Sequence, residues 1–420
     1  MRSFSRPFSK AILKAFSKTS ALLLGSAVVL VVAGMAATRD AAKKPVGWNA
    51  QASAAYLDQR EAWWASWPVA KRDQGTQCVS CHTQLPYALV RPLLRGAMKE
   101  QGLSAPEQQM LAGVTKRVEL WSQIQPFYGN ASETRVAEVK DALRDALLEA
   151  ANKVDPQRWK GPEPSFADGA RGSEAVLNAV ILTSYNSQNG DAQKGHLSAT
   201  TRKAFENMWA VQVKTGDDAG GWVWLNFHST PWEGEGSAYQ GAAFAALAVG
   251  MAPDDYQNDG VIQPQLNLLR GYLRRKYASQ SMMNKLVALW ASAKVPGVLT
   301  AAEQRALANE VLSAQQADGG WSLTSFGSWK RRDGTALVTK SDGVATGLAV
   351  VAMNAAGMAA GDKRINDAVA WLEKHQDPAE GSWAGYSLNR QRDPTSGVGR
   401  FMTDAATAYA TLALETSQRR

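Results

Sequence analysis

Cysteine and histidine are scarce in this chain of 420 residues, which contains two cysteines and four histidines. A structural zinc site needs four Cys or His ligands. Besides the cluster Cys78, Cys81 and His82, the remaining histidines lie far along the chain, at His196, His228 and His375. The scarcity therefore disfavours a zinc site, although a zinc site and a plain disulfide between the two cysteines both stay open.

Alternating apolar and polar residues, the pattern of a β-strand, are almost absent from this sequence. Gly-rich turns between Ala-rich stretches of helical periodicity take their place. A catalytic dithiol of the thioredoxin kind sits where a strand leads into a helix, so the lack of strands counts against that use of the cysteines without excluding it. The pattern predicts an all-α fold.

Acidic residues are missing ahead of the long apolar run near the N-terminus. Residues 1–50 contain eight Lys or Arg and one acid, Asp40, and so carry +7 of the formal net charge of +8. The rest of the chain is nearly neutral, which argues against a nucleic-acid partner.

The apolar run itself, residues 21–37, follows five cations, which is the order of a secretory n-region and h-region. The run is near the shortest that spans a bilayer and lacks a clean Ala-x-Ala, so cleavage after Ala36 or Ala37 and retention as an anchor are both open. Positive-inside orientation places the body outside the cytoplasm either way. We expect a periplasmic or otherwise exported protein that contacts the membrane only through residues 21–37, if uncleaved.

The strongest functional signal is the segment Cys78-Val79-Ser80-Cys81-His82. The pattern CxxCH supplies two thiols spaced to bond the two vinyl groups of a haem, and a histidine placed to ligate the iron. The segment resembles the haem-attachment motif of c-type cytochromes. In bacteria that family attaches haem outside the cytoplasm, which agrees with the leader. The sequence therefore predicts one covalent haem c, held by Cys78, Cys81 and His82, with His82 as the proximal iron ligand.

A second pattern, a turn that runs from Gln to Trp, recurs in the later part of the chain. It is complete at Gln315, Gly319 and Trp321, has one extra residue at Gln376, Gly381 and Trp383, and is looser at Gln212 and Trp222. The turns resemble the QW motif of the squalene–hopene cyclase and prenyltransferase repeat superfamily, over roughly residues 165–420. The resemblance implies an α/α toroid in which the Gln and Trp of each motif tie outer helices together.

Helical stretches fall into about six pairs on this interpretation. Ala-rich inner helices are expected near 84–98, 172–185, 237–250, 281–293, 343–357 and 403–415. Outer helices are expected near 51–66, 133–153, 199–212, 262–277, 301–315 and 363–375. The CxxCH loop would take, in the first pair, the place of a Gln-to-Trp turn at one rim. The expected division is 1–50 as signal or anchor plus linker, 51–165 as a haem-binding region, and 166–420 as toroid repeats.

The sequence leaves open which group orients His82 and which side chain, if any, is the sixth iron ligand. We expect Pro86 to interrupt a helix and leave a backbone carbonyl free, which could orient His82. His228 is the best histidine candidate for the sixth ligand, because it lies on a loop between a Gln-to-Trp turn and an inner helix. The other candidates are an open site and a further set of side chains: His196, His375, Met98, Met110, Met282, Met283 and Met402.

Neither activity of the resembled superfamily carries over, because the chain has no Asp-x-Asp-Asp acid and its cysteines are committed to CxxCH. Four carboxylates near inner-helix starts are expected to cap them: Glu174, Glu235, Asp342 and Asp404. The segment Trp232–Glu235 is the first place to seek a functional cluster. We expect electron transfer with a redox partner protein. The alternatives are a haem enzyme that acts on an isoprenoid or other apolar ligand in the cavity, and a ligand-binding or sensing module.

Deletion of residues 1–37 tests the export prediction. The truncated protein should carry no covalent haem, because it would not reach the attachment machinery outside the cytoplasm. Cell fractionation and haem staining of denatured protein measure both properties. A cytoplasmic, truncated form that still acquires covalent haem without added machinery would contradict the prediction.

Overall fold

The computed structural model describes residues 47–127, 163–188, 196–358 and 361–418, and these ranges contain helices but no β-strand. The α-helices are α1 (Ala50–Ser66), α2 (Gln84–Met98), α3 (Ala105–Glu119), α6 (Glu163–Gln188), α7 (Ala199–Ala210), α8 (Ser237–Met251), α9 (Gln263–Lys276), α10 (Met282–Ser292), α11 (Ala301–Ser313), α12 (Gly343–Ala355), α13 (Lys363–Lys374) and α14 (Phe401–Gln418). Short 3₁₀ turns lie between them, at Pro68–Ala70, Asp73–Gly75, Tyr256–Asn258, Gly260–Ile262, Tyr277–Ser279, Leu323–Phe326 and Val398–Arg400. The expectation of an all-α fold is confirmed.

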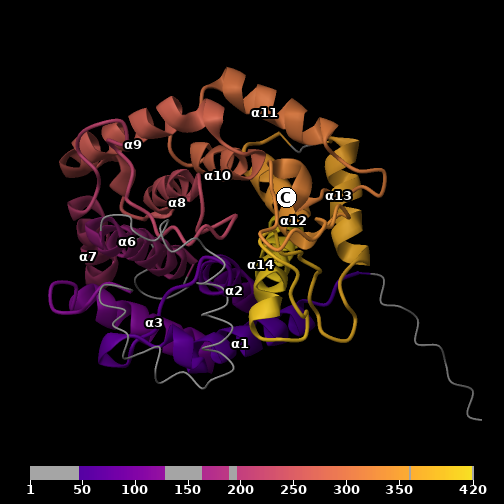
Figure 1. Ribbon diagram of the computed structural model, residues 1–420, viewed down its shortest axis with the longest axis horizontal. Helices are drawn as coiled ribbons and strands as arrows, with labels where there is room; N and C mark the ends of the chain where they lie inside the picture. The colour runs from indigo at the N-terminus through magenta and orange to yellow at the C-terminus, as the bar shows by residue number, and fades with distance from the viewer. Residues whose placement is uncertain (1–46, 128–162, 189–195, 359–360, 419–420) are drawn as a thin grey trace, which may run out of the picture. The chain divides into compact units, whose positions relative to one another are not determined.

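The helices of the unit Val46–Arg420 form an inner and an outer layer (Figure 1). Among the described residues, the inner helices α2, α6, α8, α10, α12 and α14 each pack against the next, and α14 packs against α2, so the inner ring closes. The outer helices α1, α3, α7, α9, α11 and α13 lie around it (Figure 1). The inner ring is therefore enclosed by a second layer of helices.

The inner helices are buried on nearly all sides because their side chains are small and apolar. Helix α12 is an example, with every residue from Gly343 to Asn354 buried. Gly347 lies so close to the backbone of Tyr409 in α14 that an added Cβ would stand 2.4 Å from it. Glycine is therefore required where these two helices touch.

The Gln-to-Trp turns join successive outer helices. The amide of Gln315, just after α11, donates to the carbonyl of Arg364 at the start of α13 (2.7 Å), and the Trp321 indole donates back to Val311 of α11 (2.7 Å). Gln212 likewise reaches Gln265 at the start of α9 (3.0 Å). The glutamines therefore join successive outer helices as expected, whereas the indole bond of Trp321 returns to α11, the helix that precedes it.

The same device closes the outer layer. Gln376, just after α13, exchanges two hydrogen bonds with the backbone of Asn49, the residue that caps α1: Asn49 N donates to Oε1 (2.6 Å), and Nε2 donates to the Asn49 carbonyl (2.9 Å). Gly381 in this turn has φ +74° and lies against the backbone of Ala52. The last outer helix is thereby fixed to the first.

Three expectations need correction or restriction. Pro86 does not interrupt a helix; it lies in the first turn of α2, where proline is tolerated because its missing N–H would be unpaired there in any case. Helix α3 lies between α1 and α7 in the outer layer, and the expected helix at 133–153 falls outside the described residues. Val46–Arg420 forms one compact unit, and the division at 165/166 stays a prediction.

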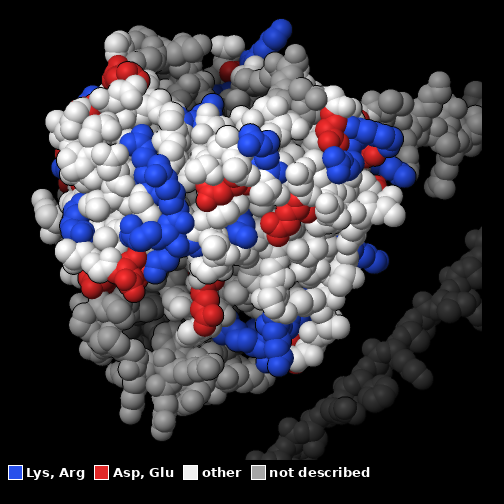
Figure 2. Space-filling model, turned by 90° about the horizontal axis from the view of Figure 1, so that it is seen from above, with Lys and Arg blue, Asp and Glu red and all other residues white. Residues whose placement is uncertain are grey.

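The leader also falls outside the described residues, within which no helix has the length and apolar character that a membrane span requires. The side of the molecule that carries α9 and α11 shows a band of Lys and Arg side chains with Asp and Glu beside it (Figure 2). Helix α9 contributes three cations to its own last turn, Arg274, Arg275 and Lys276, where they favour the negative end of the helix dipole.

Substitution Trp321→Ala tests the role of the Gln-to-Trp turn in stability. Trp321 is fully buried, and truncation of a buried Trp costs about 3–5 kcal/mol, a large share of the ~5–15 kcal/mol that holds a domain folded. We expect a sharp fall in the thermal unfolding temperature, measured by circular dichroism. Val261→Ala, at a side chain that is 79% exposed, should change it little. Equal effects in the two variants would contradict the prediction.

Candidate functional site

The CxxCH motif lies on the loop that joins α1 to α2. Cys78 and Cys81 are buried, and no disulfide joins them. The Trp64 indole of α1 donates to the Cys78 carbonyl (2.7 Å), and Ser80 Oγ accepts from the backbone N–H groups of Thr83 (3.2 Å) and Gln84 (3.0 Å) at the start of α2. The loop is thus held by the helix before it and by the helix after it. It lies between the outer and inner helices of the first pair, where a Gln-to-Trp turn was expected.

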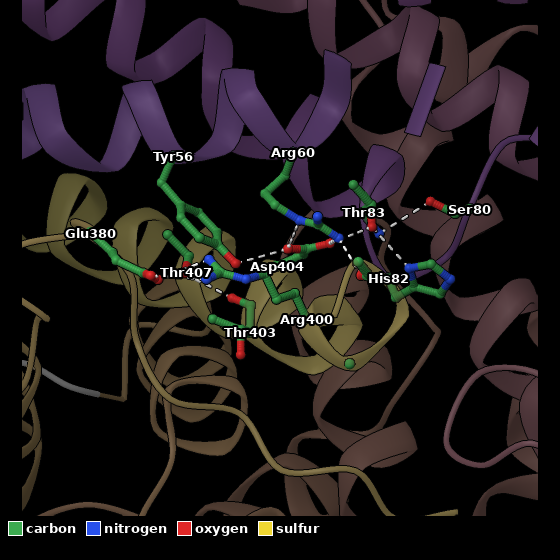
Figure 3. Close-up of polar contacts among 12 residues, drawn as sticks. Tyr56, Arg60, Ser80, His82, Thr83, Glu380, Arg400, Thr403, Asp404 and Thr407 are labelled. Carbon is green, nitrogen blue, oxygen red and sulfur yellow. Dashed lines mark hydrogen bonds and ion pairs between the residues drawn. The ribbon is translucent and has the colours of Figure 1, made fainter. Parts of the chain in front are cut away.

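The His82 imidazole is held by a relay that ends on a carboxylate (Figure 3). Its Nδ1 lies 2.9 Å from Thr83 Oγ1, and that hydroxyl donates to Asp404 Oδ2 (2.8 Å). The Thr83 proton is committed to Asp404, so the hydroxyl accepts from His82, and Nδ1 carries the imidazole proton. No hydrogen bond to Nε2 occurs within the described ranges, and this nitrogen points away from Asp404 (Figure 3). The orienting group is therefore this hydroxyl, not the carbonyl expected near Pro86.

Asp404 of α14 is itself held by a buried ion pair with the neighbouring helix α1. Arg60 of α1 donates Nε to Oδ1 (2.6 Å) and Nη2 to Oδ2 (3.0 Å), and the Tyr56 hydroxyl donates to Oδ1 (2.9 Å). Both charged side chains are nearly inaccessible. Burial raises the pKa of Asp404, while the bonds from Arg60, Thr83 and Tyr56 oppose that rise.

A second buried ion pair holds the other end of the loop. Arg117 of α3 pairs with Glu174 of α6 (Nε to Oε1, 2.5 Å), and both side chains are fully buried. The same guanidinium donates Nη1 to Thr76 Oγ1 (2.8 Å), two residues before Cys78. The haem-type motif therefore lies between two threonines, Thr76 and Thr83, each bound to an arginine–carboxylate pair.

Aromatic rings surround the His82 imidazole. Phe401 stacks on it with ring centroids 3.8 Å apart, Trp64 meets it edge-on at 5.2 Å, and Trp232 lies at 6.1 Å. Burial first, then the positive charges of Arg60 and Arg392, lower the pKa of His82 to about 3. The imidazole is therefore neutral at physiological pH, the state in which histidine binds a metal.

The segment Trp232–Glu235, singled out from the sequence, reaches this site from the hairpin before α8. Besides Trp232 beside His82, the carboxyl of Glu233 acts on Cys81, whose pKa is raised by burial first and then by Glu233 and Cys78. Glu233 is partly exposed as a whole residue. Desolvation of its carboxyl nevertheless raises the pKa of Glu233 to about 7. Glu235, by contrast, is exposed.

The other histidines do not join the motif. His228 lies on an exposed turn with φ +53°, and within the described ranges no hydrogen bond or ring contact connects its imidazole to His82. His196 bonds Asp254 (2.7 Å), and His375 stacks on Trp371. In the described part of the chain no group of three or more His, Cys, Asp and Glu side chains could hold a metal ion. The assignment of His228 as sixth iron ligand stays a prediction, and the exposed place of His228 away from His82 does not support it.

Three of the four carboxylates expected as helix caps have different roles in the structure. Asp342 caps α12 by accepting from Ala345 N (2.9 Å), as expected. Asp404 and Glu174 lie inside helices and pair with arginines, which a cap does not. These partners could not be recognised in the sequence, because Arg60 and Arg117 lie far along the chain from Asp404 and Glu174 and meet them only in the folded protein.

Comparison with known proteins gives no relative from which function can be taken. No protein-family model matches the chain, and no curated protein matches it. Among solved structures the chain is similar to a polysaccharide lyase, with 10% identity over 89% of this chain and 90% of that one and a TM-score of 0.29.

Substitution Asp404→Ala tests the buried ion pair. It leaves the Arg60 charge buried without a partner, which costs about 3–5 kcal/mol. Glu380→Ala is the matched control, because Glu380 binds Arg400 through two bonds of 2.9 Å but is 45% exposed, and such pairs contribute about 0–1 kcal/mol. Urea unfolding should show a much larger loss for Asp404→Ala. Similar losses would show that the Asp404 pair does not hold the site.

Proposed function

We propose that this protein is an exported monohaem c-type cytochrome that transfers electrons through a haem bound by Cys78, Cys81 and His82. The observation that carries the proposal is the Asp404–Thr83–His82 relay. It keeps Nδ1 protonated and directs a free Nε2 lone pair away from the protein's own hydrogen bonds. That arrangement is how proteins hold a histidine for a metal.

The donor set fits a covalent haem. No disulfide joins the two thiols, so each would form one thioether bond, and the neutral His82 would offer one nitrogen to iron. When bound, the haem supplies the one-electron Fe(III)/Fe(II) couple. The relay from Asp404 makes His82 a stronger electron donor, and this effect stabilises the oxidised state.

Electron transfer is supported by how firmly the motif is held. The two buried ion pairs at Thr76 and Thr83 fix the ends of the loop, and Trp64 fixes its middle through the Cys78 carbonyl. A rigid, water-poor setting keeps the ligand geometry the same in both oxidation states. The aromatic rings of Phe401 and Trp232 keep water from His82.

The proposal extends to the fold type and the location. Inner and outer helices alternate along the described chain, and glutamine and tryptophan turns join the outer helices, which supports an α/α toroid of the terpenoid cyclase and prenyltransferase type. The cations and apolar run of residues 1–37 support export, with the protein either released or anchored by that segment. The electron-transfer partner would be a protein outside the cytoplasm.

Replacement of both thiols tests haem attachment. Cys78→Ala/Cys81→Ala should carry no haem after denaturation, whereas the parent should give a pyridine haemochrome spectrum of a c-type haem. Covalent haem in the double variant, or none in the parent expressed with the attachment machinery, would refute the proposal.

Thr83→Val tests the relay in the haem-loaded protein. It removes the hydroxyl between His82 and Asp404, so His82 donates less charge to iron and the midpoint potential should rise, while Thr83→Ser should restore the parent value. Redox titration followed by absorbance measures the change. A potential that is the same in Thr83→Val and Thr83→Ser would show that the relay does not act on the iron.

A further inference from the structure

Three arginines gather where three loops meet beside the motif. Arg332 lies in the loop before α12, and Arg390 and Arg392 lie in the loop before α14. Burial, then Arg390 and Arg332, lower the pKa of Arg392, so the three guanidinium groups act on one another. The three arginines therefore belong to one cluster of positive charge.

Hydrogen bonds between the loops hold this cluster in place. Arg332 donates Nη2 to Ser229 Oγ (2.7 Å) and its backbone N–H to the Asn389 carbonyl (2.8 Å). Asn389 in turn exchanges two bonds with Thr230, at 2.6 and 3.0 Å. The hairpin before α8 thus reaches the loops before α12 and α14 and carries Trp232 to His82.

The cluster lacks a balancing negative charge. No ion pair joins Arg332, Arg390 or Arg392 to a carboxylate in the described part of the chain. Asp333, in the same loop, binds Thr335 (2.7 Å) and the backbone N–H of Gln391 (2.6 Å) instead. Three neighbouring like charges repel one another, so an anion at this place would stabilise them.

A buried donor nearby also lacks an acceptor. Trp232 is 6% exposed, and its indole N–H has no hydrogen-bond partner among the described residues, although a buried donor without an acceptor costs about 1–3 kcal/mol. The indole belongs to the hairpin that Arg332 holds. Guanidinium groups and an indole N–H are donors from which carboxylates accept hydrogen bonds, and here they belong to loops that are bonded to one another.

We propose that Arg332, Arg390, Arg392 and the Trp232 indole form the binding site for the two propionate carboxylates of the haem. The inference rests on the proposed function, because it presupposes a haem at Cys78, Cys81 and His82. Guanidinium forks bind carboxylates through two parallel hydrogen bonds. Arg332 and Arg392 are exposed and Arg390 is half-buried, so carboxylates held by them would lie at the solvent edge of the site, where their desolvation costs little.

Resonance Raman spectroscopy of the haem-loaded protein tests the site through the propionate bending bands, which report hydrogen bonding to the carboxylates. The variants are Arg390→Gln/Arg392→Gln and Trp232→Phe, which keeps an aromatic ring but removes the N–H. We expect the bands to shift in both variants. The control, Arg270→Gln/Arg274→Gln, removes two neighbouring arginines of α9 that bond the carbonyls of Pro296 and Gly297, and should leave the bands unchanged.

Redox titration adds a second readout. Arg390→Gln/Arg392→Gln removes cations near the iron and should lower the midpoint potential, whereas Arg392→Lys keeps the charge and should shift the Raman bands with a smaller change in potential. Unchanged bands in a haem-loaded Arg390→Gln/Arg392→Gln variant and in Trp232→Phe would overturn this inference alone, even if electron transfer to an acidic partner slowed. A parent protein without covalent haem would overturn the proposed function and this inference with it.

Discussion

The buried pair of Arg60 and Asp404 is the interaction on which the site depends. It joins the outer helix α1 to the inner helix α14. The same carboxylate also accepts a hydrogen bond from the Thr83 hydroxyl that holds His82. A buried carboxylate needs several donors to stay ionised, and Asp404 has them from Arg60, Tyr56 and Thr83. The same carboxylate therefore both joins α1 to α14 and orients the imidazole.

The inner ring places the loops before its helices at one end of the molecule, where they contact one another. The CxxCH loop precedes α2, the Trp232 hairpin precedes α8, and the arginine-bearing loops precede α12 and α14. Side chains that are 150 or more residues apart thus surround one imidazole, as the contact of His82 with Trp232 illustrates. In this fold the inner helices supply packing and their connecting loops supply the chemistry.

The Gln-to-Trp turns perform a separate task, since their bonds join outer helices and do not reach His82. The exchange between Gln376 and Asn49 is the clearest case, because it fixes the C-terminal pair to the first helix. Helix α1 is thus bonded at two places to the last helices of the chain, α13 and α14. Gln376, just after α13, bonds Asn49 at the start of α1, and Asp404 of α14 bonds Arg60 in the middle of α1. The haem-type motif follows this doubly held helix.

The sequence by itself determined the helical class, most helix positions, the turns at Gln315 and Gln376, and the motif Cys78–His82, because each depends on residues close together in the chain. It also pointed to the segment around Trp232. Only the tertiary structure decided that Thr83 and Asp404 orient His82, that Arg117 braces Thr76, and that Asp404 is no helix cap. Those contacts join residues far apart in the chain, and no local pattern records them, since they exist only once the ring has closed.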